Sequence, residues 1–382
     1  MARYARMAGW GRYLPEKVLT NHDLEQMVET SDEWIRTRTG IHERRIAGED
    51  ETTCTMSLAA SRDALDVAGV KADEVDLIIV ATVSPDYSVP AVASMVQDRL
   101  GAKRAAAFDL RAGCTGFVYA LGVGAQFIAT GAYENVLVIG AETTSRFVNW
   151  EDRNTCVLFG DGAGAVVLSA SDVPTGMLSC VLGSDGSGWD ALYVPGGGCA
   201  RPLSQAVLDQ GLHYLRMDGK RVFRFATRAL ATGVRRALSE ARLAMDDVDL
   251  IVPHQANTRI LDGARKALRI PEDKMVVNVD RYGNTSAASI PIALCEALEQ
   301  GRIQDGDNIV LVGFGAGLTW AAAAVRMGVP ETIPQLVSWT FVPLKNETVA
   351  SAKSLFKSIG LAATVLLGAL SIPFFSSRRD RD

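Results

Sequence analysis

Short runs of Val, Ile, Leu and Ala alternate with longer, helix-like segments through the first part of the chain. The runs that predict buried strands lie at 75–82, 104–108 and 135–141. The segments around them predict helices at 57–67, 92–100 and 118–130. Continuous apolar strands separated by helices indicate a mostly parallel sheet covered on both faces, and therefore an α/β fold.

The second half of the chain repeats the first at a constant spacing. The pattern Val-Asp-Leu-Ile at 75–78 recurs at 248–251, and the apolar run after Asn135 recurs after Asn308. The step from 75 to 248 equals the step from 135 to 308, 173 positions in both cases. We therefore expect a duplicated α/β unit with two pseudo-symmetric halves. The predicted divisions are 1–172 and 173–328, followed by a linker and hydrophobic extension at 329–382.

Cys114 follows the 104–108 run and precedes the 118–130 segment, which predicts a strand-to-helix turn. Gly113 and Gly116 allow the backbone to approach closely on either side. At a helix N-terminus a thiol is expected to favour the thiolate and act as a nucleophile, while free N–H groups hold an oxyanion. The alternative is a buried, inert cysteine that behaves as a small hydrophobe.

In the second half, His254 leaves the apolar run 250–253 and enters a turn, where open α/β sheets place their ligands. Asn284 stands in a small polar turn before a predicted helix, and a plain helix cap is the alternative interpretation. The glycine-dense turn at 313–317 lacks the Lys and Ser/Thr of a phosphate-binding loop. With Cys114, a neutral imidazole and a carboxamide suit acyl transfer followed by enolate stabilisation. A protease would need a cleft between unlike lobes, which a duplicated body does not favour.

The N-terminal part contains a polar stretch, 31–40, with one large aromatic residue. Asn21 ahead of it is the predicted cap of a short helix. Trp34 lies beside Arg36 and Arg38, a combination that can stack on a nucleotide base while the guanidinium groups meet phosphate. A surface tryptophan packed under arginine stems is the alternative, and the favoured one on these residues alone.

Length and composition narrow the class of protein. The 382 residues leave room for one large domain or two medium ones, and the net charge of −5 argues against a nucleic-acid partner. Six cysteines show no C-x-x-C pair and no metal spacing, so neither a metal nor a cofactor is expected. Without a recognisable signal peptide, the expected location is the cytoplasm.

These motifs together resemble the thiolase superfamily, and most specifically the β-ketoacyl-acyl-carrier-protein synthase III family, the initiating condensing enzymes of fatty-acid synthesis. The resemblance runs from about residue 7 to Met327. Its segments lie at 13–21, 31–40, 113–117, 159–164, 254–257, 283–286 and 313–320. It implies a thiolase-like fold with layers in the order α-β-α-β-α. It also implies that Cys114 accepts the acyl group, while His254 and Asn284 bind the malonyl thioester carbonyl.

The same resemblance implies the substrate contacts. Coenzyme A adenine and phosphate contacts would be Trp34, Arg38 and Arg153. The pantetheine tunnel would be lined by Met217, Gly219, Phe223, Ala226 and Asn257. Arg259 and Lys266 resemble the basic surface that meets an acidic carrier protein. Their spacing of seven places both on one helix face, with Asp262 between them as a partial counter-charge.

Two positions depart from the family pattern. Ala316 is a substrate-binding position where glycine is usual, which puts its backbone geometry, though not its N–H group, in question. Val89 stands where a residue that is often phenylalanine limits the primer pocket. The smaller valine predicts a longer or branched primer.

The sequence therefore predicts an enzyme, homodimeric by family analogy, that condenses an acyl-CoA primer with malonyl-acyl-carrier protein. The product would be a 3-oxoacyl-acyl-carrier protein. One alternative is a starter-unit synthase of a polyketide or other secondary pathway. Another is a non-catalytic acyl-CoA-binding relative, which would not need Cys114, His254 and Asn284 together.

A hydrophobic segment, Ser358–Phe375, lies beyond the resemblance and contains no charged residue. Basic side chains flank it on both sides, Lys353 and Lys357 before it and Arg378 and Arg379 after it. Its length is at the lower limit for a helix that spans about 30 Å of hydrocarbon, and its lack of a polar face fits surface docking poorly. We expect attachment to the cytoplasmic membrane face, as a span or a re-entrant insertion. A docked helix or an unstructured tail is the alternative.

Overall fold

Two β-sheets form the frame of residues 3–328, the part of the chain that the computed structural model describes. The five-stranded sheet has the order β1 (Tyr4–Tyr13), β7 (Gly162–Ser171), β6 (Asn135–Glu142), β4 (Leu77–Ala81) and β5 (Ala106–Leu110). The four-stranded sheet has the order β11 (Leu250–Pro253), β12 (Asn308–Gly315), β13 (Thr319–Arg326) and β8 (Gly176–Ser184). Two short ribbons pair β2 (Val18–Thr20) with β3 (Glu43–Arg45) and β9 (Leu192–Tyr193) with β10 (Arg216–Met217).

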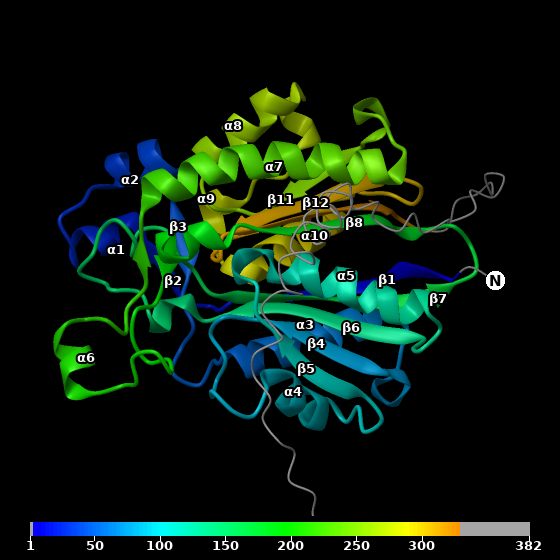
Figure 1. Cartoon of the computed structure of the whole chain (residues 1–382), viewed down its shortest axis with the longest axis horizontal. Helices are drawn as coiled ribbons and strands as arrows, with labels where there is room; N and C mark the ends of the chain where they lie inside the picture. Colours follow the sequence, from blue (N-terminus) through cyan, green and yellow to red (C-terminus); the bar gives the residue numbers. More distant parts are fainter. Residues whose placement is uncertain (1–2, 329–382) are drawn as a thin grey trace, which may run out of the picture. The chain divides into compact units, whose positions relative to one another are not determined.

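Helices cover and separate these sheets in five layers (Figure 1). One outer layer, against the five-stranded sheet, contains α3 (Thr53–Ala68) and α4 (Val92–Leu100). The middle layer, in contact with both sheets, contains α5 (Gly116–Ala129) and α10 (Ser289–Glu299). The other outer layer contains α7 (Gly219–Ala241) and α8 (Thr258–Leu268). The order α-β-α-β-α confirms the predicted thiolase-like architecture.

The internal repeat is visible in the positions at which corresponding elements of the two halves begin. β4, α5 and β6 begin at residues 77, 116 and 135, and β11, α10 and β12 begin at 250, 289 and 308. Each second-half element therefore starts 173 positions after its counterpart. The predicted division at 172/173 falls in the turn between β7 and β8, and it stays a prediction.

The prediction of a mostly parallel sheet is wrong. β4 runs parallel to β5 and β6, but β7 runs antiparallel to both β1 and β6. In the second sheet β11 and β12 are parallel, whereas β13 is antiparallel to β12 and β8. A short turn joins β12 to β13, and such a connection permits only antiparallel pairing. An apolar run indicates a strand but carries no information about the direction of that strand.

The 104–108 run is also not a buried strand. β5 lies at the edge of its sheet, and Ala106 to Leu110 are exposed or half-buried. The other two apolar runs form the central strands β4 and β6, in which nearly every residue is buried. An edge strand is covered on fewer sides than a central one, so the same apolar composition gives less burial at β5.

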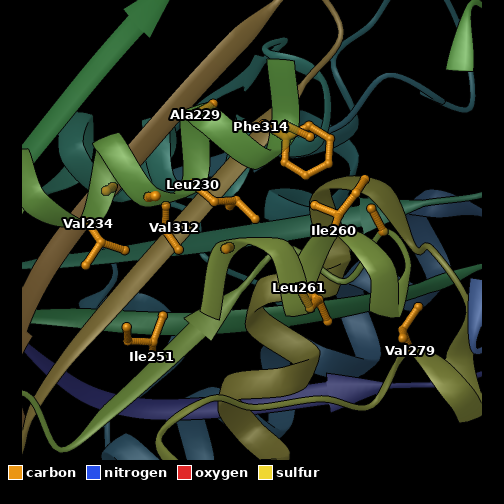
Figure 2. Close-up of a cluster of buried hydrophobic side chains, with 14 of the residues drawn as sticks. Ala229, Leu230, Val234, Ile251, Ile260, Leu261, Val279, Val312 and Phe314 are labelled. Carbon is orange, nitrogen blue, oxygen red and sulfur yellow. The ribbon is translucent and has the colours of Figure 1, made fainter. Parts of the chain in front are cut away.

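Apolar side chains fill the spaces between the layers. α5 is apolar around most of its surface because it packs against both sheets, as the sequence predicted for 118–130. On the far side of the second sheet, α7 packs Leu230 and Val234 against the sheet, and Ile260 of α8 belongs to the same cluster of buried side chains (Figure 2). This packing fixes the carboxyl end of β11, where His254 emerges.

Residues 3–328 also contain four short α-helices, which are α1 (Asn21–Glu25), α2 (Asp32–Thr39), α6 (Gln205–Asp209) and α9 (Val279–Tyr282). Thr20 caps α1 through a capping box with Asp23, so the prediction that Asn21 is the cap is wrong by one residue. The polar stretch 31–40 forms α2, which Ser31 caps at its start.

Within residues 3–328 no helix is long and apolar enough to cross a membrane. The predicted membrane segment, Ser358–Phe375, and the whole extension at 329–382 lie outside the described residues.

We expect Leu121→Ala to lower the free energy of unfolding by about 2–5 kcal/mol. Leu121 has no exposed surface and packs in the cluster between the two sheets, so its loss leaves a cavity that the rigid layers cannot close. Urea unfolding followed by circular dichroism measures the change. Leu203→Ala is the matched control, because Leu203 is 64% exposed and its truncation should cost less than about 0.5 kcal/mol.

Candidate active site

Cys114 lies where two glycine turns meet. β5 leads into a short 3-10 turn, η2 (Gly113–Thr115), which continues directly into α5, as the sequence predicted. Gly113 has a φ of 56°, and a Cβ there would lie 2.8 Å from the backbone nitrogen of Ala316. A Cβ at Gly315 would lie 2.5 Å from the backbone nitrogen of Cys114. Glycine is therefore required at both positions for the two backbones to touch.

Ala316 fits this turn without strain. It is not among the residues with positive φ, so its backbone does not require glycine. It is half-buried, and its backbone nitrogen faces Gly113 of the other turn. The alanine thus leaves the geometry of the turn intact.

Burial dominates the chemistry of the Cys114 thiol, which is only 5% exposed. Removal from water raises the pKa of Cys114 to about 12, a hydrogen bond with Ser286 opposes the increase, and the nearby Glu142 carboxylate adds to it. The prediction that the start of α5 makes Cys114 a thiolate is therefore wrong. The thiol is protonated at neutral pH, and a nucleophilic attack by Cys114 requires removal of that proton.

His254 is fully buried at the end of β11. Its backbone N–H donates to Val312 O at 2.8 Å, and its Nδ1 lies 2.5 Å from Ser289 Oγ. The Phe314 ring meets the imidazole edge-on, with the ring centroids 5.1 Å apart. Nε2 is buried and has no hydrogen-bond partner among residues 3–328. Burial lowers the pKa of His254 to about 3, so the imidazole is neutral.

Asn284 is fixed by hydrogen bonds from its own loop and from the first half. Its N–H donates to Leu158 O at 2.8 Å, and its carbonyl accepts from Gly160 N at 3.1 Å. Its side-chain Oδ1 accepts the backbone N–H of Ser286 at 2.9 Å. Because Oδ1 is occupied, the Nδ2 amide hydrogens are the part of the side chain left for a ligand.

These three residues line one cavity of about 110 Å³. The other lining residues that the sequence predicted are Met217, Gly219, Phe223 and Asn257. Lining residues that the sequence analysis missed are mostly apolar, and they are Leu158, Phe159, Leu192, Val222, Ala256, Ile260, Phe314 and Gly315. The cavity therefore has apolar walls with a few polar groups at one end, which is the usual composition of a small-molecule site.

Six of the predicted substrate-binding residues do not line this cavity, and they are Ala226, Val89, Ala316 and the three nucleotide contacts Trp34, Arg38 and Arg153. Ala226 is a buried residue of α7 and belongs to the hydrophobic core. Val89 is 84% exposed, outside the cavity, so within one chain it does not limit the space for a primer.

The predicted nucleotide contacts gather around Trp34. The Arg38 guanidinium carbon lies 5.4 Å from the centre of the Trp34 ring, and that of Arg153 lies 5.1 Å from it. Arg153 also donates to Glu29 O at 3.0 Å. An aromatic face with two exposed guanidinium groups can stack a base and pair with phosphate.

The two predicted carrier-protein residues are both exposed on α8. The Arg259 guanidinium carbon lies 5.8 Å from the centre of the Phe223 ring, and Phe223 lines the cavity. Asp262 does not neutralise Arg259 or Lys266 as expected, because it lies 3.8 Å from Arg265 instead. Both cations therefore remain available to an acidic partner.

Sequence analysis also missed Glu142, Ser286 and Ser289, the polar residues that hold the site. Ser286 and Ser289 stand in a turn of small residues where serine is common, so nothing in the pattern distinguished them. Glu142 is the last residue of the apolar strand β6. A carboxylate at the end of an apolar strand is the one sequence feature that could have identified Glu142 as a residue of the site.

Two halves that contribute a buried cysteine, a neutral histidine and an asparagine to one apolar cavity define a thiolase-like condensing enzyme. Two family models agree with this class. The model described as 3-oxoacyl-[acyl-carrier-protein] synthase III matches residues 108–186, and the model of its C-terminal part matches residues 238–327.

A β-ketoacyl-[acyl-carrier-protein] synthase III of Roseiflexus sp. (strain RS-1) is 54% identical over 326 residues, which are 85% of this chain and 99% of that protein. The crystal structure of 3-oxoacyl-[acyl-carrier-protein] synthase III from Aquifex aeolicus VF5 is 46% identical, with a TM-score of 0.79 over 84% of this chain and 99% of that one. The priming β-ketosynthase from the R1128 polyketide biosynthetic pathway is 39% identical, with a TM-score of 0.80 over 86% and 98%. The chain belongs to the 3-oxoacyl-[acyl-carrier-protein] synthase III family, whose members are acyltransferase-type condensing enzymes.

We expect the His254 imidazole to stay neutral between about pH 5 and 8, because burial holds its pKa near 3. Nuclear magnetic resonance of protein labelled with 15N-histidine measures the ring protonation, and His254→Gln identifies the resonance. The pKa of the folded state lies below the ordinary 6.5, so this group makes the fold lose stability as pH falls from 6.5 towards 3. A His254 resonance that titrates at its ordinary pH would contradict the prediction.

Proposed function

We propose that the chain catalyses a decarboxylating Claisen condensation. An acyl-CoA primer and malonyl-acyl-carrier protein give a 3-oxoacyl-acyl-carrier protein, CO2 and CoA, which initiates fatty-acid synthesis. The observation that carries the proposal is one cavity lined by the Cys114 thiol, the unpaired Nε2 of His254 and the Asn284 carboxamide. A nucleophile beside two neutral polar groups suits acyl transfer and then enolate stabilisation. A non-catalytic binding protein has no use for this combination.

In the first half-reaction, Cys114 Sγ attacks the carbonyl carbon of the acyl thioester. The backbone N–H groups of Cys114 and Ala316, on the two turns that touch, are the donors suited to the tetrahedral oxyanion. Loss of CoA leaves the acyl group on Cys114.

In the second half-reaction, malonyl-acyl-carrier protein loses CO2 and forms an enolate. The enolate oxygen needs donors, which the Nε2 of His254 and the Nδ2 of Asn284 supply. Ser289 Oγ accepts the N–H of Gln255 at 3.3 Å, so its own proton is free to donate to His254 Nδ1. That arrangement favours the tautomer with its proton on Nε2. The enolate carbon then attacks the acyl group on Cys114, and the thiol is released.

Two groups of residues are proposed to recognise the substrates. Trp34, Arg38 and Arg153 would hold the adenine and phosphates of CoA, while Arg259 and Lys266 would meet the acidic carrier protein. Helix α2, which carries Trp34 and Arg38, contacts α8, which carries Arg259 and Lys266, since Thr258 Oγ1 of α8 donates to Thr39 O of α2 at 3.3 Å. Met217, Gly219, Phe223 and Asn257 line the path to Cys114 and would contact pantetheine.

In the predicted homodimer, the exposed Val89 could limit the primer pocket, which it does not do within a single chain. Val89 and Tyr87 are both exposed apolar residues on the loop after β4, at 84% and 62%. In a homodimer, this loop of one copy would face the cavity of the other, and Val89 would then limit the primer. A larger side chain at this position would favour a short primer.

A second candidate function is the loading of a starter unit in a polyketide pathway. The 39% identity to the R1128 priming ketosynthase favours it, and the two candidates share one mechanism and differ in the primer. A cytoplasmic location and membrane attachment through Ser358–Phe375 stay predictions from the sequence.

The mechanism predicts different defects for the three cavity residues. Cys114→Ala should abolish the acyl-enzyme while the protein remains folded, because the volume change is small. His254→Ala and Asn284→Ala should slow malonyl decarboxylation by about 10²-fold or more, yet still permit acylation. Intact-protein mass spectrometry after exposure to a panel of acyl-CoAs measures acylation, and released CO2 measures decarboxylation.

The same panel identifies the preferred primer and so separates the two candidate functions. Loss of acylation in His254→Ala would make His254 the obligatory base and would overturn the division of labour. Retention of condensing activity by Cys114→Ala would overturn the mechanism as a whole.

We expect Arg38→Ala to raise the KM for acyl-CoA several-fold without changing the KM for malonyl-acyl-carrier protein. Arg36→Ala is the matched control on the same helix, because Arg36 pairs with Asp32 at 3.3 Å instead of lying over Trp34. Arg259→Ala should show the opposite pattern and weaken only the carrier substrate. Steady-state kinetics with each substrate varied in turn would contradict the assignment if Arg36→Ala and Arg38→Ala behaved alike.

A further inference from the structure

The two turns that meet at Cys114 touch without a backbone hydrogen bond between them. Gly113 and Gly315 bring the backbones together, yet no main-chain hydrogen bond within residues 3–328 joins the segment 112–115 to the segment 313–319. The two turns belong to different halves of the chain, so their spacing depends on the side chains that connect them. A pair of threonine hydroxyls makes that connection.

Thr115 follows the nucleophile, and Thr319 begins β13 just after the second turn. Both side chains are buried. Their Oγ1 atoms lie 2.8 Å apart, which is hydrogen-bond distance. Thr319 Oγ1 also lies 3.0 Å from Ala112 O in the first half and 3.1 Å from Ala316 O in its own turn. The Thr319 hydroxyl therefore reaches across the boundary between the halves.

Each threonine hydroxyl has one proton to donate. Thr115 Oγ1 donates to Ala112 O at 2.6 Å, which leaves its lone pairs free to accept. Thr319 Oγ1 has three acceptors within reach, and the two nearest, Thr115 Oγ1 and Ala112 O, both belong to the other half. A bond to either of these acceptors joins the second turn to the turn of Cys114.

The connected segments carry the two N–H groups assigned to the oxyanion, those of Cys114 and Ala316. A Cβ on Gly315 would lie 2.5 Å from Cys114 N, and a Cβ on Gly113 would lie 2.8 Å from Ala316 N. Each nitrogen therefore lies against the opposite turn. Donors stabilise an oxyanion only when they point at the position that its oxygen occupies, so a small separation of the turns would aim them at different points.

We propose that Thr115 and Thr319 are positioning residues that lock the Cys114 and Ala316 N–H groups into one oxyanion site. This inference rests on the proposed function, because the oxyanion forms when a thioester carbonyl is attacked. It forms during acylation of Cys114 and again when the enolate attacks the acyl-enzyme. The loss of CO2 from malonate is assigned to the histidine and the asparagine of the cavity, so the threonine pair should leave that step unchanged.

The test removes each hydroxyl while keeping the branched shape of the side chain. Thr115→Val and Thr319→Val are the two variants, and Thr115→Ser and Thr319→Ser retain the hydroxyl. Single-turnover acylation of the full chain by an acyl-CoA is followed by rapid quench and intact mass spectrometry. Once acylation is complete, CO2 released from malonyl-acyl-carrier protein measures decarboxylation.

Both valine variants should acylate about 10-fold more slowly at saturating acyl-CoA, a smaller loss than that of a whole oxyanion donor. The acyl-CoA concentration that gives half the maximal rate should not change, because the oxyanion forms only after binding. CO2 release should match that of the parent chain. The double valine variant should be no slower than the slower single variant, because all three break one link. Each serine variant should restore most of the rate.

Infrared spectroscopy of the acyl-enzyme adds a measurement that a loss of stability does not change. An acyl-CoA with a 13C-labelled thioester carbonyl provides the signal. Hydrogen bonds from two aligned N–H groups polarise the carbonyl of acyl-Cys114 and lower its stretching frequency. The frequency should rise in both valine variants and return towards the parent value in the serine variants.

Thr175→Val is the matched control, because Thr175 is a fully buried threonine at the opposite end of β13 from Thr319. Its Oγ1 donates to Arg326 O at 3.3 Å. This variant should lower the temperature of thermal unfolding without changing acylation or the carbonyl frequency.

A folded Thr319→Val that acylates at the parent rate, or that keeps the parent carbonyl frequency, would overturn the inference. Equal slowing of acylation and CO2 release would overturn it too, because that result indicates a general disturbance of the cavity. Thr319→Val decides the matter if thermal unfolding shows that Thr115→Val does not fold. Failure of the parent chain to acylate Cys114 would instead contradict the proposed function.

Discussion

The site depends on the contact between the turn at 113–114 and the turn at 315–316. These backbones belong to different halves, and they approach so closely that a Cβ at Gly113 or Gly315 would overlap the opposite chain. The contact places Cys114 of one half against polar groups of the other, and the backbone nitrogens of Cys114 and Ala316 both lie at this contact. A side chain at either glycine would separate the halves at the point where the chemistry occurs.

Burial is the second constraint, and it favours the neutral forms of three ionisable groups, Cys114, His254 and Glu142. It keeps the Cys114 thiol protonated, the His254 ring neutral and the Glu142 carboxylate easier to protonate. The unpaired Nε2 of His254 is costly in such surroundings, and a substrate oxygen would relieve that cost. The folded protein therefore contains an unpaired polar atom, Nε2 of His254, whose hydrogen-bond partner would be the substrate. The hydrogen bond would form at the substrate oxygen on which negative charge develops, so it would stabilise the transition state.

Sequence patterns predicted the halves, the middle-layer helix α5 and the three cavity residues, because each of these leaves a signal in spacing or neighbouring glycines. Strand direction leaves no such signal, so the mixed pairing of the two sheets was not predicted. The exposure of β5 was not predicted either, because it depends on the position of this strand at the edge of its sheet. Ser286 and Ser289 are ordinary turn residues until the fold brings Cys114 and His254 to them. The thiol pKa was misjudged because burial, a tertiary property, outweighs the helix terminus, a local one.

One cavity with one nucleophile constrains the order of the two half-reactions. Trp34 and Arg259 lie on helices that touch, and Phe223, beside Arg259, lines the cavity that contains Cys114. Both thioester substrates would therefore use the same approach, and CoA must leave before the carrier protein delivers malonate. This order makes the acyl-enzyme an obligatory intermediate that has to wait. The burial that makes Cys114 a weak acid also keeps water away from the waiting thioester, so the energetic cost at the thiol protects the intermediate.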